Sequence, residues 1–228
     1  MTMPFQIAWR YLWGHKSHNA INIVSGVSAA AVAVVTAAMI CVMSVMNGFR
    51  SELMGRVLGL NGQMGVYPEW GDELKDYEKH ITAVQGINGV VSVVPVIDAQ
   101  VMASARDASS GVMVRAMRPE DFQSRPILTD HYRGQDLSVF QTNQVILGDR
   151  LARRLGVRVG DNLTLISPKG NITAFGTIPK MKSYQVIGTF NTEMFQYDDN
   201  YIFMPLKEAQ TFFKMQDSVS HLEVFIPN

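Results

Sequence analysis

The feature that most constrains this chain is an apolar run near its start. Residues 27–46 read VSAAAVAVVTAAMICVMSVM, twenty residues without a charge, a proline or a glycine. An α-helix rises about 1.5 Å per residue, so this run would cover roughly 30 Å, the thickness of a hydrocarbon core. A cleaved signal peptide fits less well, because its apolar core runs about 7–15 residues and ends in a small-residue cleavage site. We therefore predict one N-terminal transmembrane helix, with a buried helix of a soluble protein as the alternative.

Charge divides the chain at the end of this run. No aspartate or glutamate precedes Glu52, and no formal charge lies between Lys16 and Arg50. From Asp72 onward, both signs are mixed as on an ordinary soluble surface. The formal net charge of +0 argues against nucleic acid as a partner, because phosphate binding needs a basic excess or stripe. The single cysteine, Cys41, lies in the apolar run, so the soluble part has no disulfide.

The segment before the run predicts an amphipathic helix at the membrane interface. Residues 1–19 carry apolar and aromatic side chains at helical spacing, namely Phe5, Ala8, Trp9, Leu12 and Trp13. An ordinary amphipathic core helix is the alternative for this segment. Two basic residues precede the run and two follow it, so the positive-inside rule does not choose an orientation.

The transmembrane helix is predicted to continue into water. Residues 20–62 contain the run and an apolar stripe after it, made by Phe49, Leu53 and Val57 at steps of four residues. The sequence GLNG at residues 59–62 is typical of a helix end. We therefore assign residues 20–62 to the membrane helix with its extension.

Residues 63–228 predict a mixed α+β domain, because short strand patterns alternate irregularly with helix patterns. The expected strands lie at residues 64–67, 90–96, 100–105, 111–117, 145–148, 163–166, 184–190, 201–204 and 222–226. The expected helices lie at residues 72–85, with Asp72 as N-cap, at 149–155, stopped by Gly156, and at 205–214. Residues 118–141 are expected to be a loop with short helical pieces, and residues 169–182 a loop punctuated by glycine and proline.

The sequence lacks the common motifs of catalytic and metal sites. The sequence has no phosphate-binding GxxxxGK[ST] motif, no HExxH or cysteine–histidine cluster for zinc, and no GxSxG or SxxK motif for a serine nucleophile. Asp198 and Asp199 lack the spacing of a calcium loop, so we interpret them as a solvated turn. Arg153 and Arg154 are interpreted as the exposed face of a short helix. The sequence therefore predicts neither an enzyme nor a metal site.

Four stretches resemble one family of membrane proteins. They are VMSVMNGFRSELMGRVLGLNG (42–62), GVMVRAM (111–117), VILGDRLARRLGVRVGDNLTLISP (145–168) and GTIPKMKSYQVIGTFNTEMFQYDDNYIFMPLKEAQ (176–210). Together they resemble the N-terminal part of a LolC/LolE-type permease, the membrane subunit of a lipoprotein-releasing ABC transporter in the MacB/FtsX-like superfamily. Residues 145–168 are typical of the wider superfamily, and residues 176–210 are closer to the lipoprotein-releasing branch. Residues 17–26, SHNAINIVSG, depart from the enterobacterial pattern.

The resemblance implies an architecture and a set of partners. Such permeases have four membrane helices with a MacB-like periplasmic domain between the first two, so residues 63–228 are expected to be that domain, incomplete at its C-terminus, in a fragment or the product of a split gene. The implied location is the inner membrane of a Gram-negative cell, with the N-terminus cytoplasmic and the domain periplasmic. The implied partners are an ABC ATPase subunit, a second permease subunit (the same or homologous), a periplasmic lipoprotein carrier and triacylated lipoproteins. ATP would be bound and hydrolysed by the ATPase, which leaves this chain without catalysis or a cofactor.

The resemblance also implies two functional regions. By position, the segment from Pro168 to Lys182 corresponds to a hook that holds the carrier. The docking residues would be Pro168, Lys169, Ile172, Phe175, Gly176, Pro179, Lys180 and Lys182. An ordinary hairpin loop is the alternative there.

The second region is an apolar stripe on the membrane helix. Its residues Val42, Met43, Met46 and Phe49 would line a cavity for acyl chains, a use that suits the adaptable thioether of methionine. Packing on a neighbouring helix, or exposure to lipid, is the alternative.

The expected function is to extract lipoproteins from the inner membrane and hand them to the carrier for outer-membrane sorting. One alternative is a MacB/FtsX-like mechanotransmission permease, serving efflux or the control of cell-wall hydrolases. Another alternative is a membrane-anchored binding module that stands alone.

Overall fold

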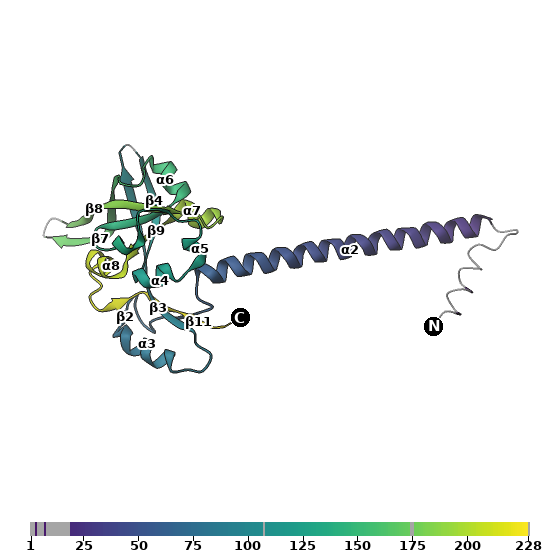
Figure 1. The fold of residues 1–228 in the computed structure, drawn as a ribbon, viewed down its shortest axis with the longest axis horizontal. Helices are drawn as coiled ribbons and strands as arrows, with labels where there is room; N and C mark the ends of the chain where they lie inside the picture. Colours follow the sequence, from purple (N-terminus) through teal and green to yellow (C-terminus); the bar gives the residue numbers. More distant parts are fainter. Residues whose placement is uncertain (1–2, 4–6, 8–18, 107, 174–175, 228) are drawn as a thin grey trace. The chain divides into compact units, whose positions relative to one another are not determined.

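The computed structural model describes residues 3, 7, 19–106, 108–173 and 176–227 (Figure 1). The chain separates into two compact units, Met1–Met54 and Gly55–Asn228, and each is described by itself. The predicted interfacial helix at residues 1–19 falls almost entirely outside the described residues.

The described helices are α2 (Asn19–Leu60), α3 (Tyr77–Gln85), α4 (Pro119–Gln123), α5 (Pro126–Thr129), the 3-10 helix η1 (Leu137–Val139), α6 (Asp149–Leu155), α7 (Phe195–Asn200) and α8 (Leu206–Phe213). The described strands are β1 (Met64–Val66), β2 (Leu74–Lys75), β3 (Ser92–Ala105), β4 (Ala108–Met117), β5 (Arg133–Gly134), β6 (Gln144–Gly148), β7 (Asn162–Thr173), β8 (Gly176–Phe190), β9 (Tyr201–Pro205), β10 (Ser218–Val219) and β11 (His221–Phe225).

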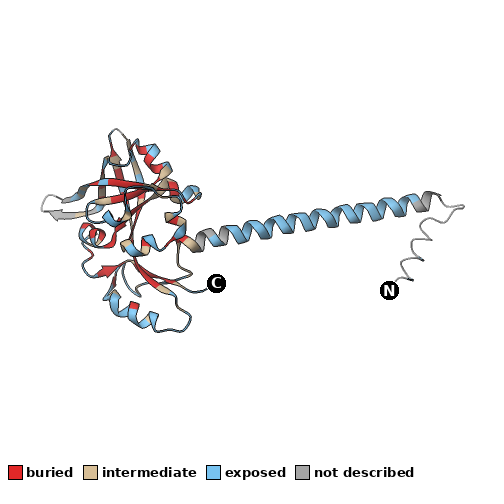
Figure 2. Ribbon diagram, viewed as in Figure 1, coloured by how far each residue is buried: buried red, intermediate tan, exposed pale blue. Residues whose placement is uncertain are grey.

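Helix α2 contains the predicted membrane span. Its segment Ile23–Glu52 has a mean hydropathy of 2.4 and is long and apolar enough to cross a bilayer, with 0% of its apolar window buried against protein. The pale blue of this helix in Figure 2 shows the same exposure. The Thr36 hydroxyl donates to the Val32 carbonyl oxygen at 2.8 Å, so this polar side chain is satisfied within the helix. The prediction of an apolar N-terminal helix that continues past Met46 is confirmed, since α2 ends at Leu60.

Six strands of the second unit close on themselves. The ring runs β3–β4–β9–β6–β8–β7 and returns to β3, because β7 pairs with both β8 and β3. The pairs β4–β9 and β6–β8 are parallel, and the other four are antiparallel. Parallel pairs need long crossovers, which accounts for the helices that separate these strands along the chain. The predicted α+β class is confirmed.

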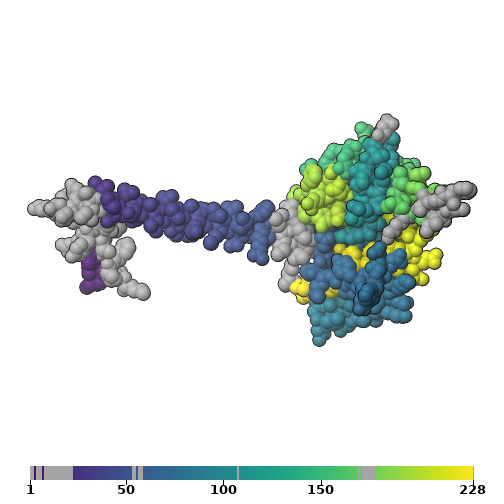
Figure 3. Space-filling view, turned by 180° about the vertical axis from the view of Figure 1, so that it is seen from behind, coloured from purple at the N-terminus to yellow at the C-terminus, as the bar shows by residue number. Residues whose placement is uncertain are grey.

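Strand β3 organises the rest of the sheet. Residues 92–96 of β3 pair with β11, and β11 in turn pairs with β1. Further along the same edge, residues 102–104 of β3 pair with β7. Segments from the two ends of the unit therefore meet, and in Figure 3 the yellow C-terminal segment lies against the blue segment that follows α2.

The core consists of two clusters formed by opposite faces of the strands. Val145 and Leu147 of β6 belong to one cluster, and Ile146 between them belongs to the other. In β9, Ile202 and Met204 lie in the first cluster and Phe203 in the second. This alternation follows from the two-residue repeat of a strand, and it explains why these strands are apolar on both faces. Figure 2 shows the buried residues in red along the strands.

Several predicted boundaries are wrong. The helix expected at 72–85 begins at Tyr77, and Asp72 does not cap it, because Leu74 pairs with Val219 in a separate two-stranded sheet. The chain turns between β2 and α3 at Asp76, whose backbone is in the left-handed conformation, with φ 50°. The strands expected at 90–96 and 100–105 are one strand, β3.

The predicted α6 is confirmed. It spans Asp149–Leu155 and ends at Gly156, whose φ of 67° is the left-handed stop expected from the sequence. The interpretation of Asp198 as part of a solvated turn is wrong. Its carboxylate is buried and accepts hydrogen bonds from the Thr192 amide at 2.7 Å and the Thr192 hydroxyl at 2.9 Å. Arg153 and Arg154 are exposed, as predicted, although Arg154 also pairs with Asp199 at 2.7 Å.

Gly148, at the junction of β6 and α6, provides a test of this packing. A Cβ there would overlap the backbone carbonyl of Asp198, because α7 approaches this position closely. We expect Gly148→Ala to lower the free energy of unfolding by about 1–3 kcal/mol through overpacking. The measurement is urea unfolding of the purified chain in detergent, followed by circular dichroism.

Gly86→Ala is the matched control, because a Cβ at Gly86 would meet nothing closer than 3.5 Å. This variant should change the free energy of unfolding by no more than about 0.5 kcal/mol. Equal effects of the two alanines would contradict the close packing of α7 on Gly148.

Candidate functional site

The predicted docking segment is part of a long hairpin rather than a loop. Strands β7 and β8 pair from Asn162↔Gln185 to Ser167↔Lys180, and again from Asn171↔Ile178 to Thr173↔Gly176. The loop expected at 169–182 is therefore wrong, and the prolines sit in the interruption instead of at the ends of a loop. Proline has no amide hydrogen to donate to the ladder, so Pro168 and Pro179 break the pairing only locally. A side chain on Gly170 would collide with the Ile178 carbonyl, so glycine lets the two strands approach there.

The structure distributes the predicted docking residues along this hairpin. Seven of the eight lie in β7 or β8, and Phe175 lies outside the described residues. In Figure 1 the distal parts of β7 and β8 stand clear of the rest of the unit. Ile178 is 60% exposed and Met181 is 64% exposed. Met181 was missed at the sequence level, because the loop interpretation gave no reason to expect its side chain on a surface.

Two of the predicted docking lysines contact the domain itself. The Lys180 ammonium donates to the Thr211 carbonyl oxygen of α8 at 3.0 Å and lies 5.3 Å from the centroid of the Phe212 ring. The Lys182 ammonium pairs with the buried Glu208 carboxylate at 2.7 Å. These contacts fasten the middle of the hairpin to α8.

Glu208 also accepts a hydrogen bond from the Tyr184 hydroxyl at 3.0 Å. Burial and the neighbouring Glu208 carboxylate raise the pKa of Tyr184, so the phenol stays a donor at any physiological pH. The base of the hairpin is thereby a fixed support for its distal part.

A buried ionic cluster holds the end of α2 within the second unit. Arg125 donates from Nη1 to the Leu60 carbonyl oxygen and from Nη2 to Glu223 Oε2, the latter at 2.7 Å. Arg115 donates from Nη1 to Asn61 Oδ1 at 2.5 Å and to Glu223 Oε1 at 3.3 Å. Glu223 thus lies between two guanidinium groups that each also bind the end of α2. We call Arg115, Arg125 and Glu223 the helix clamp.

Asp98 and His221 are further polar neighbours of the helix clamp. Arg115 binds the Asp98 carboxylate with two hydrogen bonds, at 2.9 Å from Nε and 2.8 Å from Nη2. His221 Nε2 lies 3.9 Å from Glu223 Oε1. Among the described residues, no buried side-chain nitrogen or oxygen lacks a hydrogen-bond partner. A fully satisfied network of this kind is the condition under which buried charge is tolerated.

The charge of Glu223 is strongly favoured in the fold. Burial opposes ionisation, but the His221 side chain and the guanidinium groups of Arg125 and Arg115 outweigh it and hold the pKa of Glu223 at about 2. No sequence motif indicates this cluster, because its members are separated by as many as 108 residues along the chain.

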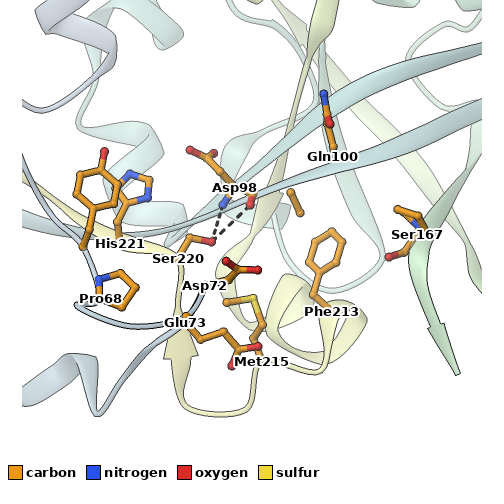
Figure 4. A pocket seen from close by; sticks show the side chains of 14 residues that line it. Pro68, Asp72, Glu73, Asp98, Gln100, Ser167, Phe213, Met215, Ser220 and His221 are labelled. Atoms are coloured by element: carbon orange, nitrogen blue, oxygen red, sulfur yellow. Dashed lines mark hydrogen bonds between the residues drawn. The ribbon is translucent and has the colours of Figure 1, made fainter. Parts of the chain in front are cut away.

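A cleft of ≈ 630 Å³ opens beside β3 (Figure 4). The fourteen described residues that line it come from the loop after β1, from β3, from the start of β11, from the region of α8 and from Ser167 and Pro168 of β7. Ser167 lies at one side in Figure 4. Among the predicted docking residues whose side chains the structure describes, Pro168 lines the cleft. No sequence motif indicates the cleft, because segments far apart in the chain form it.

The apolar stripe of α2 lies in the first unit. Val42, Met43, Met46 and Phe49 are all exposed within that unit. At about 100° per residue, Val42, Met46 and Phe49 share one face, and Met43 lies at its margin. Their contact with acyl chains stays a prediction.

The described residues offer few groups for metal chemistry. Across residues 19–106, 108–173 and 176–227, no group of three or more histidine, cysteine, aspartate and glutamate side chains is placed to hold a metal ion.

The profile of the MacB-like periplasmic core domain matches residues 25–226. The chain therefore belongs to this family, and the predicted resemblance to the N-terminal part of LolC/LolE-type permeases is confirmed.

Two relatives are lipoprotein-releasing system transmembrane proteins. LolC of Neisseria meningitidis serogroup B is 27% identical over 223 residues, which cover 96% of this chain and 53% of that protein. LolE of Haemophilus influenzae is 25% identical over 236 residues, which cover 98% of this chain and 55% of that protein. The chain thus spans about half the length of the curated relatives it matches.

Two solved structures are also similar. The extracellular domain of the ABC-type transporter YknZ from Gram-positive bacteria is 12% identical, with a TM-score of 0.49 and coverage of 74% of this chain and 83% of that domain. The periplasmic region of MacB from Actinobacillus actinomycetemcomitans is 11% identical, with a TM-score of 0.49 and coverage of 75% and 78%.

The pKa of Glu223 yields a prediction about acid stability. Because its folded pKa of about 2 lies below the ordinary 4.5, its contribution is complete above pH 4.5 and is lost as the pH falls toward 2. The shift corresponds to about 3 kcal/mol of folding free energy. We expect Glu223→Gln to destabilise the protein by about 3–5 kcal/mol at pH 7, since two buried guanidinium groups lose their shared partner.

Urea unfolding at pH 7 and at pH 3 provides the measurement. The loss of stability between these two pH values should be smaller in Glu223→Gln than in the parent. Glu120→Gln is the control, because that exposed carboxylate lies 3.8 Å from Arg118 outside the cluster. An identical acid response in Glu223→Gln and the parent would contradict the low pKa.

Proposed function

We propose that this chain is the domain-bearing part of a permease subunit in a lipoprotein-releasing ABC transporter. The observation that carries the proposal is similarity to LolC and LolE proteins across 92–98% of the chain. It applies to the membrane helix and to the folded domain together, since the family match begins at residue 25 and ends at residue 226. The subunit acts without catalysis of its own and works with an ATPase that binds and hydrolyses ATP.

The proposed location follows from the same similarity. The segment Ile23–Glu52 crosses the inner membrane of a Gram-negative cell, with residues before it in the cytoplasm and the second unit in the periplasm. The stripe of Val42, Met46 and Phe49 faces a second permease subunit or the acyl chains of a triacylated lipoprotein. Both surroundings would cover side chains that are exposed within the first unit.

The hairpin β7–β8 is proposed to dock the periplasmic carrier that receives the lipoprotein. Two sets of side chains in β8 support this proposal. Lys180 and Lys182 bind α8. Ile178 and Met181, which are close to them in the strand, are exposed. Exposed apolar side chains on a fixed support lose little conformational entropy when they bind a partner. Lys180 and Lys182, two of the predicted docking residues, therefore hold the hairpin, and Ile178 and Met181, which were not among them, are proposed to make the contact.

Site-specific photocrosslinking in the complete transporter tests this docking. A benzoylphenylalanine at Met181 should crosslink to the carrier, and the same group at Val159, which is 42% exposed elsewhere on the unit, should not. Ile178→Asp should reduce the Met181 crosslink about tenfold or more, because a charge replaces a buried apolar contact at the interface.

Lipoprotein release from proteoliposomes provides the functional readout, and it should fall with the crosslink in Ile178→Asp. Val139→Asp, a substitution at a valine that is 40% exposed outside the hairpin, serves as the control for release. Release that persists in Ile178→Asp together with an undiminished crosslink would reject the docking role of the hairpin. ATP-dependent export of a different substrate class without lipoprotein release would favour the efflux alternative.

A further inference from the structure

One end of the sheet in the second unit carries exposed apolar side chains. Strands β1 and β3 both pair antiparallel with β11, so they begin at the end of the sheet where β11 finishes. Met64 at the start of β1 is 60% exposed, Val91 just before β3 is 68% exposed, and Ile226 just after β11 is 37% exposed. Ile87, in the turn that leads to Val91, is 58% exposed. We call these four residues the apolar sheet end.

Backbone contacts gather these residues around the end of β11. The Val91 amide donates to the Phe225 carbonyl oxygen at 2.8 Å, and the Ile226 amide donates to Gln63 Oε1 at 3.2 Å. A Cβ on Gly62 would lie 2.9 Å from two backbone atoms of β11, so glycine lets the segment after α2 lie against that strand. The apolar sheet end therefore adjoins the segment that follows α2.

The three chain segments that meet here lack charged side chains. Residues 57–68, 81–97 and 224–228 contain no aspartate, glutamate, lysine or arginine, although these residues make up 18% of the chain. Exposed apolar side chains that gather in one place mark sites of contact with protein or with a membrane. A protein interface normally has a polar rim, often with charges that select the partner, so the absence of charge in these segments favours a membrane.

Helix α2 limits how far the apolar sheet end can lie from a membrane. Residues 53–60 continue the helix beyond the span Ile23–Glu52, and at about 1.5 Å per residue they cover roughly 12 Å. Arg125 fixes the end of this stretch in the second unit, through its hydrogen bond to the Leu60 carbonyl oxygen. The polar region of one leaflet is about 5–8 Å thick. The apolar sheet end is therefore tethered within reach of the lipid headgroups.

We propose that the apolar sheet end contacts the surface of the lipid bilayer that α2 crosses. Apolar side chains at a membrane surface become buried about 5–10 Å into the boundary between headgroups and acyl chains, which removes them from water. The second unit would then have an attachment to the membrane besides α2. This inference rests on the proposed membrane crossing of α2, and it is independent of the transported substrate.

Fluorescence quenching by spin-labelled lipids tests this contact in the whole chain. The single cysteine is removed by Cys41→Ala, and a new cysteine at Val34, Val91 or Val159 carries a bimane. These valines are 68%, 68% and 42% exposed, so each accepts a label at the surface of its unit. The labelled chain is placed in phosphatidylcholine nanodiscs, one chain per disc, so that no second copy can cover the label. The discs contain a nitroxide lipid, labelled either on the headgroup or deep in the acyl chain.

The Val91 bimane should lose about half of its fluorescence to the headgroup nitroxide, and the Val159 bimane less than about a tenth. The Val34 bimane should be quenched by the acyl-chain nitroxide, because Val34 lies in the proposed span. Absence of quenching at Val34 would reject the membrane crossing of α2, and the inference with it. Quenching at Val34 without quenching at Val91, or equal headgroup quenching at Val91 and Val159, would overturn the lipid contact alone.

A charged substitution tests whether burial of apolar side chains drives the contact. With the bimane at Ile87, Val91→Asp should reduce headgroup quenching at least about twofold, because a carboxylate opposes entry into the apolar side of the headgroup region. Val139→Asp, at an exposed valine outside the apolar sheet end, should leave the quenching unchanged. Circular dichroism checks that both variants are folded. Equal quenching of the Ile87 label in the two variants would overturn the proposed contact.

Discussion

The ionised Glu223 carboxylate between Arg115 and Arg125 is the interaction on which the arrangement of the second unit depends. It joins β11 to β4 and to the segment before α5, and both arginines also bind the end of α2. A buried charge without partners would be prohibitively costly, so each group here requires the others. The helix end, the sheet and the cleft beside β3 therefore share one polar network, since Asp98 binds Arg115 of the helix clamp and also lines the cleft.

Elements determined by local chemistry could be predicted from the sequence. The apolar run of α2 and the left-handed stop of α6 at Gly156 depend on neighbouring residues alone. The hairpin was misread because Gly170 and Pro179 usually mark loops, and only the opposite strand shows that they accommodate an interruption in pairing. Asp198 was interpreted as a surface residue because nothing in the sequence marks Thr192 as its partner. The Thr192 amide and hydroxyl donate the hydrogen bonds that satisfy the buried carboxylate.

The candidate site was harder to predict, because its contacts are long-range. The family resemblance pointed to the hairpin, but the positions of Lys180 and Lys182 depend on Thr211 and Glu208, 31 and 26 residues further along. Periodicity reports which face of an element is buried, not which distant segment covers it. The helix clamp and the cleft combine residues from both ends of the unit, so neither produces a contiguous motif.

The placement of β11 has a consequence for the order in which the protein assembles during synthesis. Among the described strands, β1 pairs only with β11, whose residues are translated more than 150 positions later, as the pairing Met64↔Val224 shows. Arg115 and Arg125 are likewise made long before Glu223, which they share. The end of α2 therefore leaves the ribosome well before its anchor exists, and contacts of such sequence separation form slowly. An early-emerging β1 edge that must wait for its partner is exposed to mispairing, which makes a chaperone valuable at this stage.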